Sequence, residues 1–281
     1  MTAPGPDDAE TRTADRAAQT PGTGGHEDGA DALEDVSLDA ELRALVEVHR
    51  RASGPGMRLL SLLGDQAGSL LDRIPGPVKG QLEANASRAL ELSYSGAKAT
   101  RNSRLPDPAD WLTTAMTSAM GAAGGMGGLP SAMAEIPVTT TVLMRAMQGI
   151  AAEHGFDPAE QDTRLDCLQV FAAAGPLTGD EGGEAGFLTL RLALSGPGMK
   201  ALVARVAPIF AMTMGRKLAA QAVPVLGAVA GAAVNWVYTS YYQDMARVHF
   251  GLKAIARDRG MDHAALVGTF REMLADAPVA R

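Results

Sequence analysis

The chain has 281 residues, of which 46% are hydrophobic and only 4% aromatic, with 32 glycines and 14 methionines. This composition supplies a sizeable core and favours close contact between helices over aromatic-filled sheet packing. The net charge is −7, but residues 1–36 hold nine acids and two bases and the rest is balanced, which excludes the strongly basic footprint of a nucleic-acid-binding domain.

The N-terminal 36 residues are predicted to form a disordered acidic tail. They are rich in Gly, Thr, Asp, Ala and Pro, and such a segment buries too little apolar surface to offset its ordering entropy. The first residues show neither the basic nor the apolar region of a signal peptide, so we expect a cytoplasmic protein. Residues 277–281 are expected to form a flexible C-terminus.

The stretch between these ends, residues 37–276, is predicted to be one all-α domain. Helical periodicity begins at Ser37, a suitable N-cap, and Asp110 and Asp262 are further cap candidates. Gly155 fits the C′ glycine that ends a helix. No window alternates with a period of two, so we expect a multi-helix bundle without a sheet. The predicted helices, interrupted by glycine and proline, cover residues 37–52, 60–74, 78–101, 136–154, 162–174, 185–195, 198–222, 224–258 and 263–275.

Two long segments carry no charge. Residues 111–134 and 218–243 contain no acid or base, and each includes or adjoins a G-x-x-x-G pair, Gly124 with Gly128 and Gly227 with Gly231. Small residues at this spacing let helix backbones approach closely, in a soluble core or in a bilayer. The segments therefore fit buried core helices, helices at a membrane surface, or a transmembrane pair.

The charges after residue 184 favour contact with a membrane surface. Between Ala185 and Gln243 there are five bases and no acid. A cationic segment with apolar helices suits an anionic membrane surface or lipid on the inner face of the cell membrane. The alternative is that these bases pair with acids elsewhere in the fold. The five are Arg191, Lys200, Arg205, Arg216 and Lys217.

Two sequence stretches resemble the bacterial EcsC family. Residues 121–158 read GAAGGMGGLPSAMAEIPVTTTVLMRAMQGIAAEHGFDP, and residues 215–252 read GRKLAAQAVPVLGAVAGAAVNWVYTSYYQDMARVHFGL. The likeness spans residues 38–260. It implies a bacterial protein without a settled activity, and because the family is named after a gene beside an ABC transporter, it implies a link to a membrane transporter complex or the envelope. It brings no catalytic residues.

Polar residues in the same stretches form a candidate cluster: Glu135, His154, Asp244 and His249. Asp and His serve as acid–base groups and metal ligands. However, Asp244 and His249 are five residues apart, about 140° around a helix, which is a poor arrangement for a shared metal. We expect no metal and no cofactor. The single cysteine, Cys167, lies in an apolar run and is predicted to be a buried structural thiol.

Three functions remain open from the sequence. The first is a non-enzymatic, membrane-associated helical protein that binds lipid or a membrane partner. The second is a soluble hydrolase-like enzyme that uses Glu135, Asp244 and His249. The third is a protein-interaction scaffold.

Overall fold

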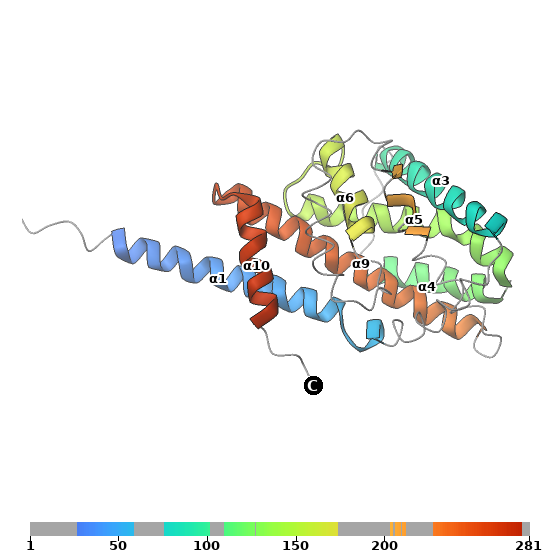
Figure 1. Cartoon of the computed structure of the whole chain (residues 1–281), viewed down its shortest axis with the longest axis horizontal. Helices are drawn as coiled ribbons and strands as arrows, with labels where there is room; N and C mark the ends of the chain where they lie inside the picture. Colours follow the sequence, from blue (N-terminus) through green and yellow to red (C-terminus); the bar gives the residue numbers. More distant parts are fainter. Residues whose placement is uncertain are drawn as a thin grey trace, which may run out of the picture. The chain divides into compact units, whose positions relative to one another are not determined.

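The computed structural model describes most of the predicted domain (Figure 1). Its described part is almost entirely helical and contains no strand, which confirms the all-α prediction. The described residues are 27–58, 76–101, 110–126, 128–173, 203–204, 206–208, 210–211 and 227–276. The predicted helices at 60–74 and 185–195, the tail before residue 27 and the C-terminus 277–281 lie outside this part.

Among the described helices, four begin and end within three residues of the predicted bounds, two begin earlier, and the one at residues 110–126 occupies an uncharged segment to which no helix was assigned from the sequence. In chain order they are α1 (Glu27–Ala52), α3 (Gly76–Arg101), α4 (Asp110–Met126), α5 (Gly128–Glu153), α6 (Gln161–Ala173), α9 (Gly227–Asp258) and α10 (His263–Asp276). The described positions between 203 and 211 are also helical, within the helix predicted at 198–222.

Helix α1 begins ten residues earlier than predicted, at Glu27 instead of Ser37. The composition of residues 27–36 suggested disorder, but this stretch also contains Ala and Leu, which are strong helix formers. Once the first turn of a helix exists, each further residue adds a backbone hydrogen bond at little cost, so a helix extends into such a sequence. Residues 1–41 form a separate unit from residues 42–281.

Helix α5 also begins earlier than predicted, at Gly128, so that Pro137 lies inside the helix and does not open it. An interior proline removes one backbone hydrogen bond, and it usually kinks or breaks a helix. Two threonine hydroxyls bond the carbonyls at this point. Thr140 Oγ1 donates to the Ile136 oxygen at 2.6 Å, and Thr141 Oγ1 donates to the Pro137 oxygen at 2.8 Å. The helix also packs against α3, α4, α6 and α9.

Local signals at the helix ends agree with the prediction. Gly155 ends α5 with a φ of 79°, and the Phe156 N–H donates to the Ala151 oxygen at 3.0 Å, as in a Schellman motif. Asp262 caps α10, because its Oδ1 accepts the Ala265 N–H at 2.8 Å.

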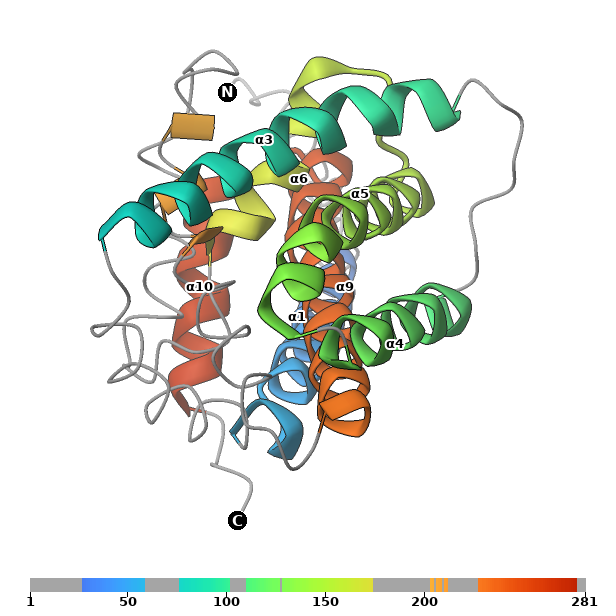
Figure 2. The same cartoon turned by 90° about the vertical axis from the view of Figure 1, so that its right-hand side faces the viewer.

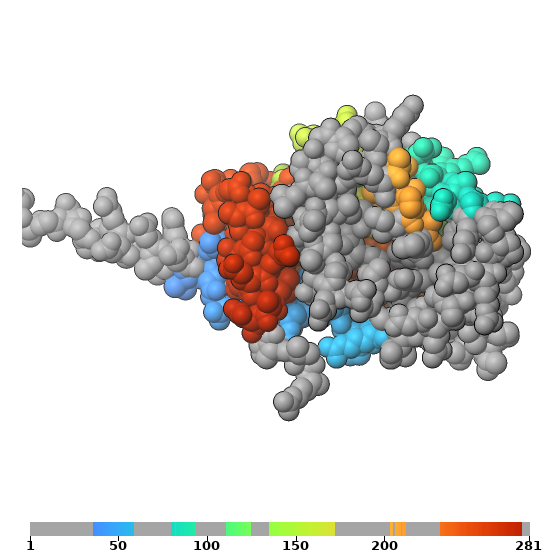
Figure 3. Space-filling view, in the orientation of Figure 1, coloured from blue at the N-terminus to red at the C-terminus, as the bar shows by residue number. Residues whose placement is uncertain are grey.

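Within residues 42–281, the long helix α9 packs against α4, α5, α6 and α10, while α3 packs on α5 (Figures 1 and 2). Figure 3 shows α10, in red, beside the C-terminal part of α1, where the rings of His49 and Phe270 meet edge to face at 6.2 Å. Several phenylalanine and tyrosine rings pack together in the core. Phe171 contacts Phe210 and Tyr242 at centroid distances of 5.3 and 5.0 Å, and all three are fully buried.

Cys167 is fully buried, as predicted. No helix among the described residues combines the length and the hydropathy that crossing a bilayer requires.

Candidate functional site

Helix α4 is inverted: its polar side faces the core and its apolar side faces outward. Thr113, Thr114 and Thr117 are buried, with exposed fractions of 1%, 3% and 0%. Leu112 and Met116 are exposed by 38% and 46%. A surface helix of a water-soluble protein normally shows the opposite arrangement. We define the outer face of α4 as its exposed, uncharged residues Trp111, Leu112, Met116, Ala119 and Ala123.

Two of the three buried threonines, Thr114 and Thr117, bond to polar groups on α9. Thr117 Oγ1 lies 2.7 Å from Thr239 Oγ1, and Thr114 Oγ1 donates to Gln243 Oε1 at 3.2 Å. Asn235 Nδ2 donates to the Thr117 backbone oxygen at 2.6 Å. These bonds fix the orientation of α4, because turning its apolar side inward would leave buried polar groups on α9 unpaired.

Glycines permit the close approach of α4 and α9. Gly121 and Gly231 face each other, and a Cβ atom added to either would lie well under 3.0 Å from the carbonyl oxygen of the other. Four glycines, those of the two G-x-x-x-G pairs, were candidates for membrane contact; Gly124 and Gly231 are buried, and Gly231 packs against Gly121 of α4. The other two, Gly128 and Gly227, are the first residues of α5 and α9.

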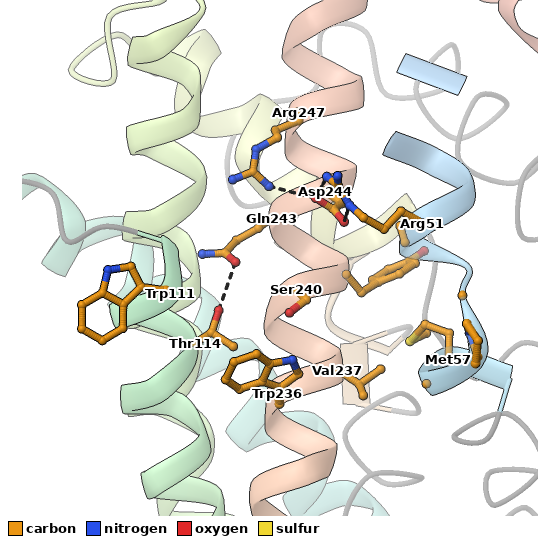
Figure 4. Close-up of a pocket in the computed structure, with 15 residues that line it drawn as sticks. Arg51, Met57, Trp111, Thr114, Trp236, Val237, Ser240, Gln243, Asp244 and Arg247 are labelled. Carbon is orange, nitrogen blue, oxygen red and sulfur yellow. Dashed lines mark hydrogen bonds and ion pairs between the residues drawn. The ribbon is translucent and has the colours of Figure 1, made fainter. Parts of the chain in front are cut away.

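A pocket of about 470 Å³ opens beside α4, between the C-terminal part of α1, α4 and α9 (Figure 4). The only two tryptophans of the chain, Trp111 and Trp236, both line it, and they are exposed by 68% and 52%. The other lining residues are Arg51, Ala52, Gly54, Pro55, Gly56, Met57, Thr114, Val237, Ser240, Tyr241, Gln243, Asp244 and Arg247.

Two arginines converge on Asp244 at one end of the pocket (Figure 4). Arg51 binds both carboxylate oxygens, through Nε at 3.1 Å and Nη2 at 2.8 Å, and Arg247 Nη1 donates to Oδ1 at 2.9 Å. The hydrogen bond to Asp244 raises the pKa of Arg51. Burial, followed by the charge of Arg51, lowers the pKa of Arg247. The cluster therefore holds two cations around one carboxylate.

The predicted cluster of Glu135, His154, Asp244 and His249 does not assemble, because each residue has different partners. Glu135 Oε1 accepts from Asn235 Nδ2 at 2.6 Å and from Thr139 Oγ1 at 2.9 Å. His154 Nδ1 lies 2.8 Å from the Ile150 carbonyl of its own helix. Glu135 bonds to Asn235 of α9, which is nine residues, or about 13 Å along the helix axis, from Asp244. Glu135 and Asp244 therefore contact different parts of α9.

His249 belongs to a separate group of polar side chains that joins α9 to α6. Its Nε2 lies 3.3 Å from Asp166 Oδ1, and Lys253 Nζ binds Asp166 Oδ2. Burial alone raises the pKa of Asp166, but His249, and then Lys253, outweigh burial and lower that pKa to about 2. Asp166 therefore carries its negative charge at neutral pH and fastens α6 to α9.

These positions remove the geometric basis of the hydrolase-like alternative. It requires Glu135, Asp244 and His249 around one substrate, but Asp244 is the only one of the three that lines the pocket. In the part of the chain that the structure describes, no three His, Cys, Asp or Glu side chains are arranged to hold a metal ion.

The five predicted basic residues, Arg191, Lys200, Arg205, Arg216 and Lys217, lie outside the described residues. Sequence reasoning missed the pocket itself. One signal was present: the chain has two tryptophans, and each lies in or at the edge of an uncharged, glycine-rich segment. The pairing of Arg51 with Asp244, which are 193 residues apart, had no signal in a single sequence.

Comparison with known proteins gives one family. The sequence profile described as the EcsC protein family matches residues 103–255, a range that contains α4, α5, α6 and most of α9. No curated protein and no solved structure matches the chain.

Proposed function

We propose that this chain, which belongs to the EcsC protein family, is a peripheral membrane protein whose helix α4 lies on an anionic lipid surface with its outer face in contact with lipid. The observation that carries the proposal is the inverted polarity of α4. Thr114 and Thr117 bond inward to α9, and the uncharged outer face carries exposed Leu112 and Met116. An interfacial helix buries such a face at the boundary between headgroups and acyl chains.

The tryptophans support the same surface. Trp111 belongs to the outer face of α4, and Trp236 lines the adjoining pocket from α9. Tryptophan is enriched at the boundary between water and lipid, where its ring contacts hydrocarbon and its N–H remains hydrated. Both rings are more than half exposed, although burying such a ring in the core is the more common outcome in a water-soluble domain.

Charge supports an anionic surface over a neutral one. Arg51 and Arg247 lie in the pocket beside this face and share the single carboxylate of Asp244. The sequence adds the five bases of residues 191–217 without an acid among them. Each base close to an anionic membrane contributes about 1 kcal/mol to binding.

Vesicle flotation tests the proposal. The wild-type protein is expected to float with vesicles of phosphatidylglycerol and phosphatidylcholine at low salt. Leu112→Glu and Met116→Glu are expected to reduce the bound fraction at least about tenfold, because each removes apolar contact and places a negative charge at the surface. Neither side chain is buried, so both variants should keep the helical fold, which circular dichroism checks.

The matched control is Leu92→Glu on α3. Leu92 is exposed by 49%, similarly to Met116, but it lies on a different helix. This variant should float like the wild type. Equal flotation of all three variants and the wild type would overturn the assignment of the outer face of α4. Capture by a protein partner in place of vesicles would favour the scaffold alternative.

A further inference from the structure

The end of the pocket that contains Arg51, Arg247 and Asp244 carries a net positive charge. Two guanidinium groups bind one carboxylate, and the Arg51 side chain is 61% exposed while that of Asp244 is 9% exposed. Glu47, one turn before Arg51 on α1, adds a smaller attraction to Arg51 but does not line the pocket. An anion that enters from solvent therefore meets an exposed arginine before it meets the carboxylate.

The remaining walls are largely apolar. Trp111, Trp236, Val237 and Met57 supply hydrocarbon and ring surface, while Ser240 adds a hydroxyl near the middle of the lining in Figure 4. A volume of about 470 Å³ falls in the range of small-molecule pockets. A cationic end joined to apolar walls matches an amphiphile whose polar head carries negative charge.

We propose that this pocket binds one anionic phospholipid, with its phosphate at Arg51 and Arg247 and the upper part of its acyl chains against Trp111 and Trp236. Guanidinium groups bind phosphate oxygens through paired hydrogen bonds, which Asp244 already orients by holding both arginines in place. The inference rests on the proposed function, because contact of α4 with lipid places the pocket at the surface from which a lipid enters.

The test uses the full chain in solution without vesicles. Both tryptophans line the pocket, so their fluorescence reports its occupancy without a label. Dihexanoylphosphatidylglycerol, kept below its micelle concentration, is expected to give a saturable change. Arg51→Gln should weaken this binding at least about tenfold. Arg43→Gln, an exposed arginine on the same helix that does not line the pocket, should leave it unchanged.

A second variant keeps the test valid if the loss of Arg51 disturbs the fold. Ser240→Phe fills the middle of the pocket from a partly exposed position and leaves Arg51, Asp244 and Arg247 in place. It should abolish the saturable response while circular dichroism remains that of the wild type. Binding of the lipid by both Arg51→Gln and Ser240→Phe with wild-type affinity would overturn the proposed site.

Two further ligands distinguish the source of the phosphate. Inorganic phosphate has the charge without the chains, and dihexanoylphosphatidylcholine has the chains with a neutral head. Both should bind at least about tenfold more weakly than dihexanoylphosphatidylglycerol. Equal affinity for inorganic phosphate would overturn the lipid assignment in favour of a small anion. Absence of any saturable response, with vesicle flotation intact, would refute the pocket inference and leave the proposed function standing.

Discussion

Asp166 shows how a single buried carboxylate joins two helices. It pairs from α6 with His249 and Lys253 of α9, and its pKa is lowered from 3.8 to about 2. A carboxylate with a lowered folded-state pKa stabilises the fold fully above its unfolded pKa, and this contribution is lost as the pH falls through the folded value. The relevant window is therefore pH 4 to pH 2, and the contribution is about 2 kcal/mol.

Replacing Asp166 with Asn should remove this pH-dependent part of the stability. We expect the free energy of unfolding of the wild type to exceed that of Asp166→Asn most at pH 5 and above. The difference should shrink by about 2 kcal/mol between pH 4 and pH 2. Urea unfolding of both proteins at several pH values measures it. A difference that stays constant across this window would contradict the role assigned to the ion pairs.

At the scale of helices, the contact of α4 with α9 depends on the absence of side chains at Gly121 and Gly231. Because each backbone occupies the space of the other's missing Cβ, Gly231→Ala must separate the helices and weaken the hydrogen bond between Thr117 and Thr239. We expect the free energy of unfolding to fall by about 2 kcal/mol or more.

The control for this substitution is Gly268→Ala in α10. Nothing lies within 4 Å of an added Cβ at Gly268, and the residue has no positive φ. The change should raise the free energy of unfolding by about 0.5–1 kcal/mol, since alanine favours the helix. Thermal unfolding of the wild type and both variants measures these changes in the free energy of unfolding. Equal effects of the two substitutions would show that Gly231 does not set the distance between α4 and α9.

The helix ends were predictable because their signals are local. Gly155 and Asp262 act within a few residues of their own positions, and both do what the sequence indicated. The start of α5 was not, because Pro137 favours the first turn of a helix, whereas α5 begins nine residues earlier, at Gly128. Local chemistry therefore identified most of the helices, while their exact extents depended on tertiary packing.

The candidate site was less predictable. The spacing of apolar and polar residues defines the two sides of a helix, and the apolar side normally faces the core. In α4 the side with the threonines is buried and the side with Leu112 and Met116 is exposed, which the spacing alone does not indicate. The structure also separates Glu135 from Asp244 and His249, although all three lie in the stretches that resemble the EcsC family. Partners such as Arg51 and Asp244 come from distant parts of the chain and require the fold to be known.

For the molecule as a whole, the proposed function requires that the side that carries Trp111 and Trp236 contacts lipid. Quenching of the wild-type tryptophans by anionic vesicles that contain brominated acyl chains tests it most directly, since the chain has no other tryptophan. We expect the tryptophan fluorescence to fall when the protein binds the vesicles, and acrylamide to quench the remaining fluorescence less than it does in solution. Protein that floats with the vesicles while its tryptophan fluorescence and acrylamide quenching stay unchanged would contradict the claim.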